Sequence, residues 1–135
     1  MRGRKPELRP DANAVAAIMK PPAWLSKDAK TEWRRIMPGL TARKTLTDAD
    51  LGSLENYCIA SGQVREMQKI VAREGSVIQT DRGPRAHPAV RIQSDAMTRA
   101  RLLAAELGLT PVSRSRPSIR DDGGADDEHS SDLGI

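Results

Sequence analysis

The chain has 135 residues, of which 38% are hydrophobic and only 2% aromatic. So few large apolar side chains predict one domain with a thin core, which favours self-association. The net charge is +4, and because residues 121–135 contribute −6, the rest of the chain stands at +10. This imbalance favours a polyanion, such as nucleic acid, as partner of the body of the chain.

The motifs of membrane, secreted and nucleotide-binding proteins are missing. No apolar run approaches the ~20 residues of a membrane span, and no secretory signal or Gly-rich phosphate motif occurs, so we expect an intracellular protein. The single Cys58 argues against a disulfide and a thiolate zinc site, and its apolar neighbours predict a buried thiol. His87 and His129 lie too far apart in the sequence to indicate a metal site. We therefore expect no enzyme activity, cofactor or metal.

The first helix is expected to follow a basic arm formed by residues 1–20. Ser26 is a good N-cap, and Pro21 and Pro22 stop any helix upstream of it. Apolar residues then recur at helical spacing: Ala29, Trp33, Ile36, Met37 and Leu40. This stripe predicts a buried face.

The end of this first helix and the roles of the two tryptophans can also be predicted. Pro38 and Gly39 are expected to end or kink the helix. Trp33 is predicted to be buried, and Trp24 is predicted to fold back onto the helix entry. Stacking of either ring on bases is the less favoured use.

A second and unusually long helix is predicted from Thr47 to Glu74, followed by Gly75. Asp50 lies three residues after Thr47, as in a capping box. Capping of the helix start therefore explains Asp48 and Asp50 better than acid–base catalysis does. Two faces of this helix are apolar. One face holds Leu51, Leu54, Cys58 and Gly62, and the other holds Tyr57, Ala60, Val64, Met67 and Val71. We favour a contact of the second face with another subunit over a sandwich between two helices of the same chain or a kink at Gly62.

The rest of the chain predicts a hairpin, a third helix and a tail. Residues 76–87 contain a turn signal between short apolar runs, and Pro88 suits the first position of a helix that Gly108 closes. The inner stripe of this helix is expected to be Ala89, Ile92, Ala96, Ala100, Leu103 and Leu107. Residues 112–135 are expected to form a disordered tail, basic and then acidic, so residues 21–111 are the predicted helical core and oligomerisation domain.

The candidate DNA-binding residues are basic side chains of both arms, of the first helix and of the hairpin. They are Arg2, Arg4, Lys5, Arg9, Arg34, Arg35, Arg43, Lys44, Arg82, Arg85, Arg114 and Arg116. Such side chains bind phosphates through counterion release, largely without reading sequence. The alternative is a solvated charged surface.

Several stretches resemble the small subunit of tailed-phage terminases. They are MRGRKP at 1–6, PPAWLSKDAKTEW at 21–33, LTDAD at 46–50, YC at 57–58, HPAV at 87–90 and AELGLTPVSRSR at 105–116. The resemblance implies a non-enzymatic homo-oligomeric ring that holds double-stranded viral DNA when packaging begins. It also implies recruitment of the large ATPase and nuclease subunit, in the cytoplasm of the host cell, with no membrane partner.

Two other functions remain open at this point. A dimeric DNA-binding transcriptional regulator would bind a palindrome as two chains. An adaptor protein that does not bind DNA would use its basic residues for solubility alone. The helix-turn-helix of many small terminases is not recognisable, because the second helix is too long for a recognition helix.

Overall fold

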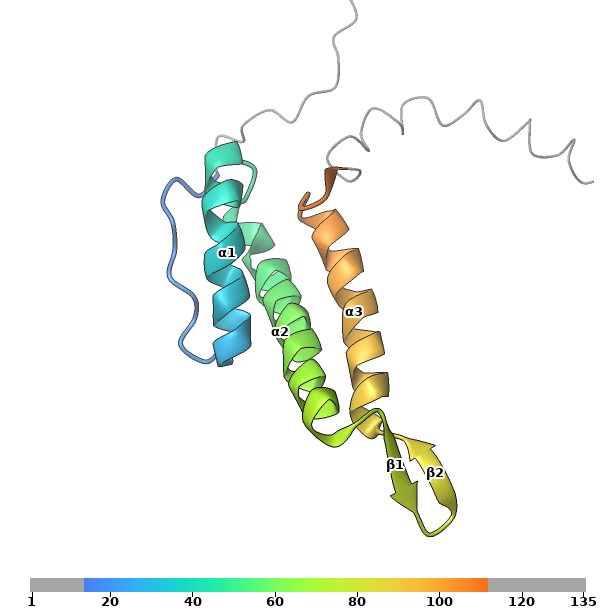
Figure 1. Cartoon of the computed structure of the whole chain (residues 1–135). Coiled ribbons are helices and arrows are strands. Elements are labelled where there is room, and N and C mark those ends of the chain that lie inside the picture. The colour runs from blue at the N-terminus through green and yellow to red at the C-terminus, as the bar shows by residue number, and fades with distance from the viewer. Residues whose placement is uncertain (1–13, 112–135) are drawn as a thin grey trace, which may run out of the picture.

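The computed structural model describes residues 14–111, which form three helices and one hairpin (Figure 1). In chain order the elements are α1 (Lys27–Arg43), the 3-10 turn η1 (Asp48–Asp50), α2 (Leu51–Glu74), β1 (Val77–Thr80), β2 (Gly83–Ala86) and α3 (Pro88–Glu106). The predicted mainly α fold, with one long central helix and a small hairpin, is confirmed. The predicted arm up to residue 13 and the tail from residue 112 lie outside the described residues.

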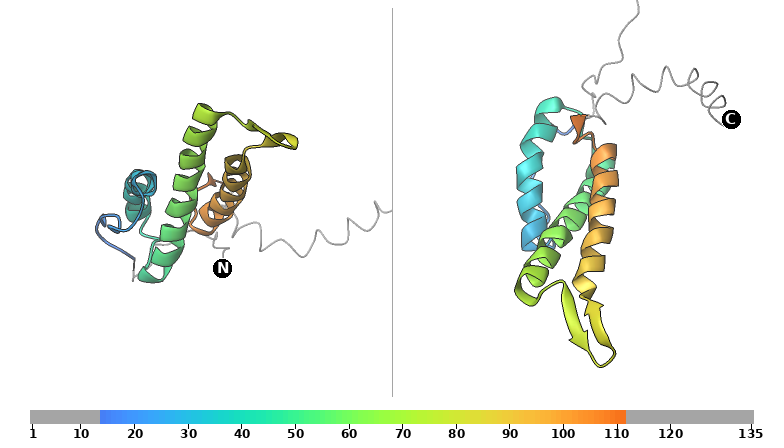
Figure 2. Two further views of the ribbon diagram at one scale, coloured as in Figure 1. Left: turned by 90° about the horizontal axis from the view of Figure 1, so that it is seen from below. Right: turned by 45° about the vertical axis from the view of Figure 1, so that its right-hand side comes forward.

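The helix α2 lies between α1 and α3 and contacts both of them (Figures 1 and 2). Against α1 the approach is close, because a Cβ built on Gly62 would lie 2.8 Å from the backbone nitrogen of Ala29. Against α3, the side-chain amide of Gln93 donates to the carbonyl oxygen of Val64 at 3.1 Å. Two other helices of the same chain therefore cover the two apolar faces of α2.

The packing of α2 between α1 and α3 of the same chain bears on the predicted contact with another subunit. Tyr57 and Ala60 are only 8% and 4% exposed within one protomer, so little of either side chain is available to another subunit, and their contact with one stays a prediction. The hydroxyl of Tyr57 is used inside the chain, where it donates to Glu32 at 2.6 Å. Val64, Met67 and Val71 are half-buried, and their contact with another subunit stays a prediction.

The helix α1 begins where Ser26 predicts and ends later than Pro38 suggests. The Ser26 hydroxyl accepts from the amide of Ala29 at 3.3 Å, and the helix continues to Arg43, where Lys44 adopts a left-handed conformation with φ 56°. Pro38 has no backbone N–H, so the carbonyl of Arg34, four residues earlier, loses its helical hydrogen bond. Both residues lie on the exposed face of the helix. Water can bond that carbonyl, so the helix need not end.

Residues 14–25 run along α1 as an extended strap (Figure 1). The amide of Val15 donates to the carbonyl of Leu46 at 2.7 Å, and the indole N–H of Trp33 donates to the carbonyl of Met19 at 2.8 Å. The last residues of the predicted arm thus belong to the folded part of the chain. The expected fold-back of Trp24 is wrong, because its neighbour Leu25 enters the core and Trp24 is 64% exposed.

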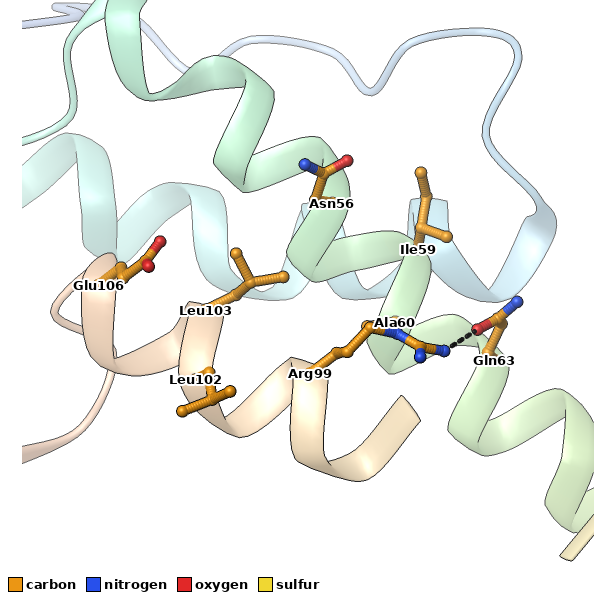
Figure 3. Close-up of a pocket in the computed structure, with 8 residues that line it drawn as sticks. All are labelled: Asn56, Ile59, Ala60, Gln63, Arg99, Leu102, Leu103 and Glu106. Atoms are coloured by element: carbon orange, nitrogen blue, oxygen red, sulfur yellow. Dashed lines mark hydrogen bonds between the residues drawn. The ribbon is translucent and has the colours of Figure 1, made fainter. Parts of the chain in front are cut away.

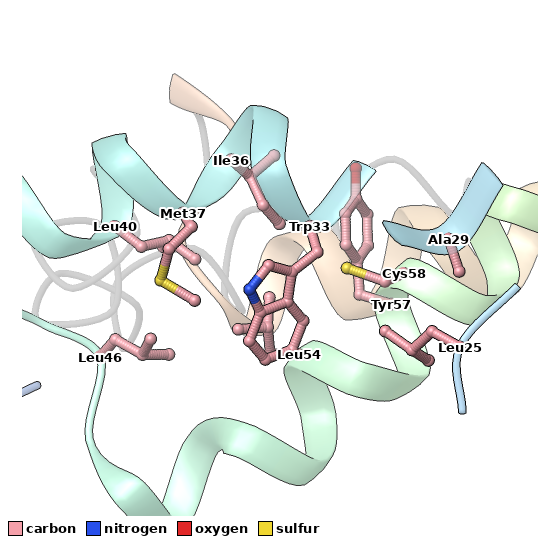
Figure 4. Close-up of a cluster of buried hydrophobic side chains, with 10 residues drawn as sticks. All are labelled: Leu25, Ala29, Trp33, Ile36, Met37, Leu40, Leu46, Leu54, Tyr57 and Cys58. Atoms are coloured by element: carbon pink, nitrogen blue, oxygen red, sulfur yellow. The ribbon is translucent and has the colours of Figure 1, made fainter. Parts of the chain in front are cut away.

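The core lies mainly between the strap, α1 and the first half of α2 (Figure 4). Its buried side chains are Leu25, Ala29, Trp33, Ile36, Met37, Leu40, Leu46, Leu54, Tyr57 and Cys58. Trp33, 2% exposed, is the largest of them, which confirms its predicted role. The turn into α2 is fixed by Asp50, whose carboxylate accepts from the backbone N–H and the hydroxyl of Thr47 at 2.9 and 3.0 Å.

The hairpin and α3 form the other side of the molecule. Strands β1 and β2 pair antiparallel, with Gly83 at φ 101° directly after the turn. The ring nitrogen Nδ1 of His87 accepts from the amide of Ala89 at 3.0 Å and caps α3. Ala89 and Ala96 are buried as predicted, whereas Ile92 is 42% exposed. Gln93 faces α2 in its place, so the inner stripe is rotated from the predicted one.

Candidate nucleic-acid interface

The carboxylate of Glu32 is the most constrained charged group of the described residues. Its side chain is 1% exposed, and it accepts hydrogen bonds from Arg35 at 2.8 and 2.6 Å and from Arg65 at 3.0 Å, besides the one from Tyr57. Burial alone would raise the pKa of Glu32, but the hydrogen bonds from Arg35 and Tyr57 and the charges of Arg35 and Arg65 outweigh it and lower the pKa. Glu32 therefore stays ionised and joins α1 to α2.

The other acidic residue of α1 is also paired with a base of α2. The carboxylate of Asp28 accepts from the ammonium of Lys69 at 2.9 and 3.2 Å. Both acids of α1 thus face α2, where Arg65 and Lys69 are the bases that meet them. Few bases of α2 are then left free on that side, and the negative charge of α1 is neutralised inside the protomer.

Three of the bases of α1 lie on the side of the helix opposite its acids, which we call the outer face of α1: Lys27, Lys30 and Arg34. Their spacing of three and four residues puts the three side chains on one stripe. Lys27 and Arg34 are exposed and Lys30 is half-buried. Within residues 14–111 no salt bridge engages any of the three. The segregation of acids and bases makes this stripe a positively charged surface.

The remaining predicted DNA-binding residues are distributed over separate surfaces. Arg35 adjoins the outer face of α1, but its guanidinium is held by Glu32, which raises its pKa further. Arg43 and Lys44 lie at the end of α1, and Arg82 and Arg85 are exposed on the hairpin beside the α2–α3 end of the molecule (Figure 1). The hairpin and α1 do not form one patch. The predicted residues of the two arms lie outside the described part of the chain: Arg2, Arg4, Lys5, Arg9, Arg114 and Arg116.

Residues 14–111 offer no clear candidate for a catalytic nucleophile or a metal site. Cys58 is fully buried, and burial raises the pKa of its thiol to about 12, so it is an inert core residue rather than a nucleophile. Burial and the neighbouring Glu32 raise the pKa of Tyr57 to about 12 as well. No group of His, Cys, Asp or Glu side chains that could hold a metal ion occurs among these residues, and none of their helices is long and apolar enough to cross a membrane.

A groove of about 440 Å³ opens between α2 and α3 (Figure 3). Its apolar lining comes from Ile59 and Ala60 of α2 and from Leu102 and Leu103 of α3. Polar groups surround it, namely Asn56, Gln63, Arg99 and Glu106. The guanidinium of Arg99 donates to the side-chain oxygen of Gln63 at 3.3 Å across the groove. The sequence did not indicate this groove, because its two sides are about 40 residues apart.

Comparison with known proteins gives one family. The model of the family described as "Phage terminase, small subunit" matches residues 29–123. The match includes the LTDAD, YC, HPAV and ELGLTP stretches and only the end of the PPAWLSKDAKTEW stretch, and MRGRKP precedes it. No curated protein and no solved structure shows a significant match to the chain.

Proposed function

The chain belongs to the small-subunit family of phage terminases, and we propose that it binds double-stranded viral DNA at the start of packaging through the outer face of α1. In this proposal the protein is not itself an enzyme. It holds the DNA in the cytoplasm of the host cell and presents it to the large subunit, which performs the ATPase and nuclease reactions.

The observation that carries this proposal is the separation of charge across α1. Asp28 and Glu32 are neutralised toward α2, while Lys27, Lys30 and Arg34 have no acidic partner within residues 14–111. A base that is already paired gains little from a phosphate, because the existing ion pair must first be given up. Unpaired bases on one stripe can instead each release a counterion from the DNA.

The dimensions of the stripe suit a DNA backbone. Lys27 and Arg34 are seven residues apart, which is about 10 Å along a helix. One strand of a duplex presents a phosphate about every 3.4 Å of axis, so the three bases match about three phosphates. Contacts of this kind position the DNA and do not read its sequence.

A pair of triple variants tests the proposal. We expect Lys27→Ala, Lys30→Ala and Arg34→Ala together to weaken the binding of the full chain to a mixed-sequence DNA duplex at least ~10-fold at moderate salt, measured by fluorescence anisotropy. The matched control removes three exposed bases elsewhere: Arg73, Arg91 and Arg101, each changed to Ala. An equal loss in both variants would mean that net charge alone matters, and this would refute a role for the outer face of α1.

Recruitment of the large subunit is the second part of the proposed role, and it rests on family membership. The acidic residues of 121–135 are a candidate contact, because their charge of −6 is opposite to that of the body. Deletion of 121–135 should change either the affinity for DNA or the stimulation of the large subunit's ATPase activity. If neither measurement changes, the segment has no part in either interaction.

A further inference from the structure

Trp24 is a large aromatic side chain that the fold holds in solvent. The chain has two Trp, one Tyr and no Phe. Trp33 and Tyr57 are buried in the core, whereas Trp24 is 64% exposed. The amide of Leu25 donates to the carbonyl of Pro22 at 3.2 Å, and Leu25 itself is buried. These contacts fix the backbone on both sides of Trp24, so the exposure of its ring follows from the fold.

Trp24 lies at the end of the strap, next to the outer face of α1. The indole N–H of Trp33 bonds the strap at Met19, and Trp33 follows Lys30 by three residues, so the strap runs beside the row that holds Lys30. In Figures 1 and 2 the strap borders α1 on the side away from α2. Trp24 is three residues before Lys27, so their Cα atoms are at most about 11 Å apart. The exposed ring and the outer face of α1 are thus neighbours on one side of the molecule.

The chain around Trp24 carries positive charge and no free acid. Residues 14–26 contain one charged side chain, Lys20, which is exposed. No salt bridge engages Lys20 in the part of the chain that the structure describes. The acid nearest to Trp24 in the sequence is Asp28, whose carboxylate is held by the ammonium of Lys69 at 2.9 Å. An anionic ligand that reaches the ring therefore meets positive charge that no acid compensates.

An exposed aromatic ring beside lysine and arginine side chains is the combination that binds single-stranded nucleic acid. Nucleobases stack on the ring while the charged side chains follow the phosphates. In a duplex the faces of the nucleobases are covered by their neighbours, and a side chain reaches them only by unstacking a step. We propose that Trp24 stacks on an unpaired nucleobase, so that this side of the molecule holds single-stranded as well as duplex DNA. Lys20 and Lys27 then contact the phosphates on either side of the stacked nucleobase.

The ring and the charged side chains respond differently to salt. The inference rests on the proposed DNA contact of the outer face of α1, and it adds unpaired nucleotides to what that face binds. Contacts with phosphates release counterions and weaken as the salt concentration rises, whereas stacking on a neutral ring releases none. Stacking also tolerates any sequence, because every nucleobase has a π-face. Trp24 should therefore raise the affinity for single strands by a factor that stays constant with salt.

Fluorescence anisotropy on the full chain, with an oligothymidylate strand and a mixed-sequence duplex of equal length, tests the inference. We expect Trp24→Ala to weaken binding of the single strand about tenfold, the effect of one stacked nucleobase, and to change duplex binding less than about twofold. The salt dependence of binding should stay as in the wild type. Trp24→Phe keeps an aromatic ring and should retain most of the affinity. The control is Ile18→Ala, since Ile18 is 63% exposed on the same strap but cannot stack.

Tryptophan fluorescence gives a second readout that reports on Trp24 itself. Saturation with oligothymidylate should quench part of the emission of the wild type. It should quench none of the emission of Trp24→Ala, because Trp33 is buried in the core. Circular dichroism and light scattering check that the helical content and the mass of each variant match those of the wild type.

Several results would overturn the inference. They are a wild type that does not bind oligothymidylate, a Trp24→Ala variant that binds it as tightly as the wild type or loses as much affinity for the duplex, and an Ile18→Ala variant that loses as much as Trp24→Ala. A Trp24→Ala variant with lower mass and unchanged affinity would also overturn it, since the ring would then serve a contact between copies. The proposed function fails by a different result, namely unchanged duplex binding in the triple variant at Lys27, Lys30 and Arg34.

Discussion

Gly62 of α2 lies in close contact with the backbone of α1, so Gly62→Ala tests the packing of the fold. A Cβ at this position would lie 2.8 Å from the backbone nitrogen of Ala29, 3.1 Å from its Cα and 3.2 Å from its Cβ. Backbone atoms within a helix cannot move aside individually, so α1 would have to shift as a whole. That shift would loosen the contacts of Glu32 and Asp28 with α2, which lie on the same side of α1.

The expected magnitude is the difference of two opposing effects. Overpacking costs about 1–3 kcal/mol, and a clash with backbone belongs at the upper end of that range. Replacing a glycine inside a helix by alanine stabilises the helix by about 1 kcal/mol. We therefore expect Gly62→Ala to lower the free energy of unfolding by about 2 kcal/mol, which for a domain of this size lowers the melting temperature by roughly 10 °C.

Urea denaturation followed by circular dichroism measures this difference. The matched control is Gly39→Ala in α1, where a Cβ meets nothing within 4 Å. It should stabilise the protein by ~0.5–1 kcal/mol, because only the gain in helix propensity remains. If Gly62→Ala stabilised the protein as much as Gly39→Ala does, the close contact of α1 with α2 would be refuted.

Three further predictions concern the buried groups around Glu32. Glu32→Gln should lower the free energy of unfolding by about 2 kcal/mol in urea, since Arg35 and Arg65 lose their shared carboxylate, and a change under 0.5 kcal/mol would contradict the network. Because the folded pKa of Glu32 lies below its ordinary value of 4.5, its contribution is complete above that pH and is lost as the pH falls through the lowered value. Acid titration of the free energy of unfolding should therefore show a steeper loss below pH 4.5 in the wild type than in Glu32→Gln. The thiol of Cys58 should react with a disulfide reagent at pH 8 only after unfolding, and rapid reaction of the native protein would show that the core opens readily.

Local signals in the sequence predicted the boundaries of most elements. Ser26 caps α1, Asp50 binds back to Thr47 before α2, and Gly75 and Pro88 end one helix and begin the next. Each of these depends on residues within four positions of one another. Such interactions are readable because chain neighbours are also neighbours in space.

The contacts between elements could not be predicted in the same way. Trp24 and Leu25 are adjacent apolar residues, and only the path of the strap decides that Leu25 is buried and Trp24 exposed. The buried carboxylate of Glu32 depends on Tyr57 and Arg65, which are 25 and 33 residues away. The sequence does place Arg35 three residues after Glu32, but this spacing is equally typical of an ion pair on a helix surface.

The candidate DNA surface shows the same limit. The sequence identified Arg34 as a candidate but could not separate it from Arg35, its neighbour. The structure distinguishes them, because Glu32 holds Arg35 and leaves Arg34 unpaired within the described residues. Lys27 and Lys30 were not among the candidates, although their helical spacing with Arg34 was a signal that could have found them.

The salt dependence of DNA binding tests the central claim most directly. The logarithm of the association constant is measured against the logarithm of salt concentration for the full chain and for the triple variant at Lys27, Lys30 and Arg34. Each phosphate contact contributes about 0.9 to the slope, so loss of three contacts should reduce it by about 2.7. An unchanged slope would contradict the account, because the outer face of α1 would then make no contact with DNA phosphates.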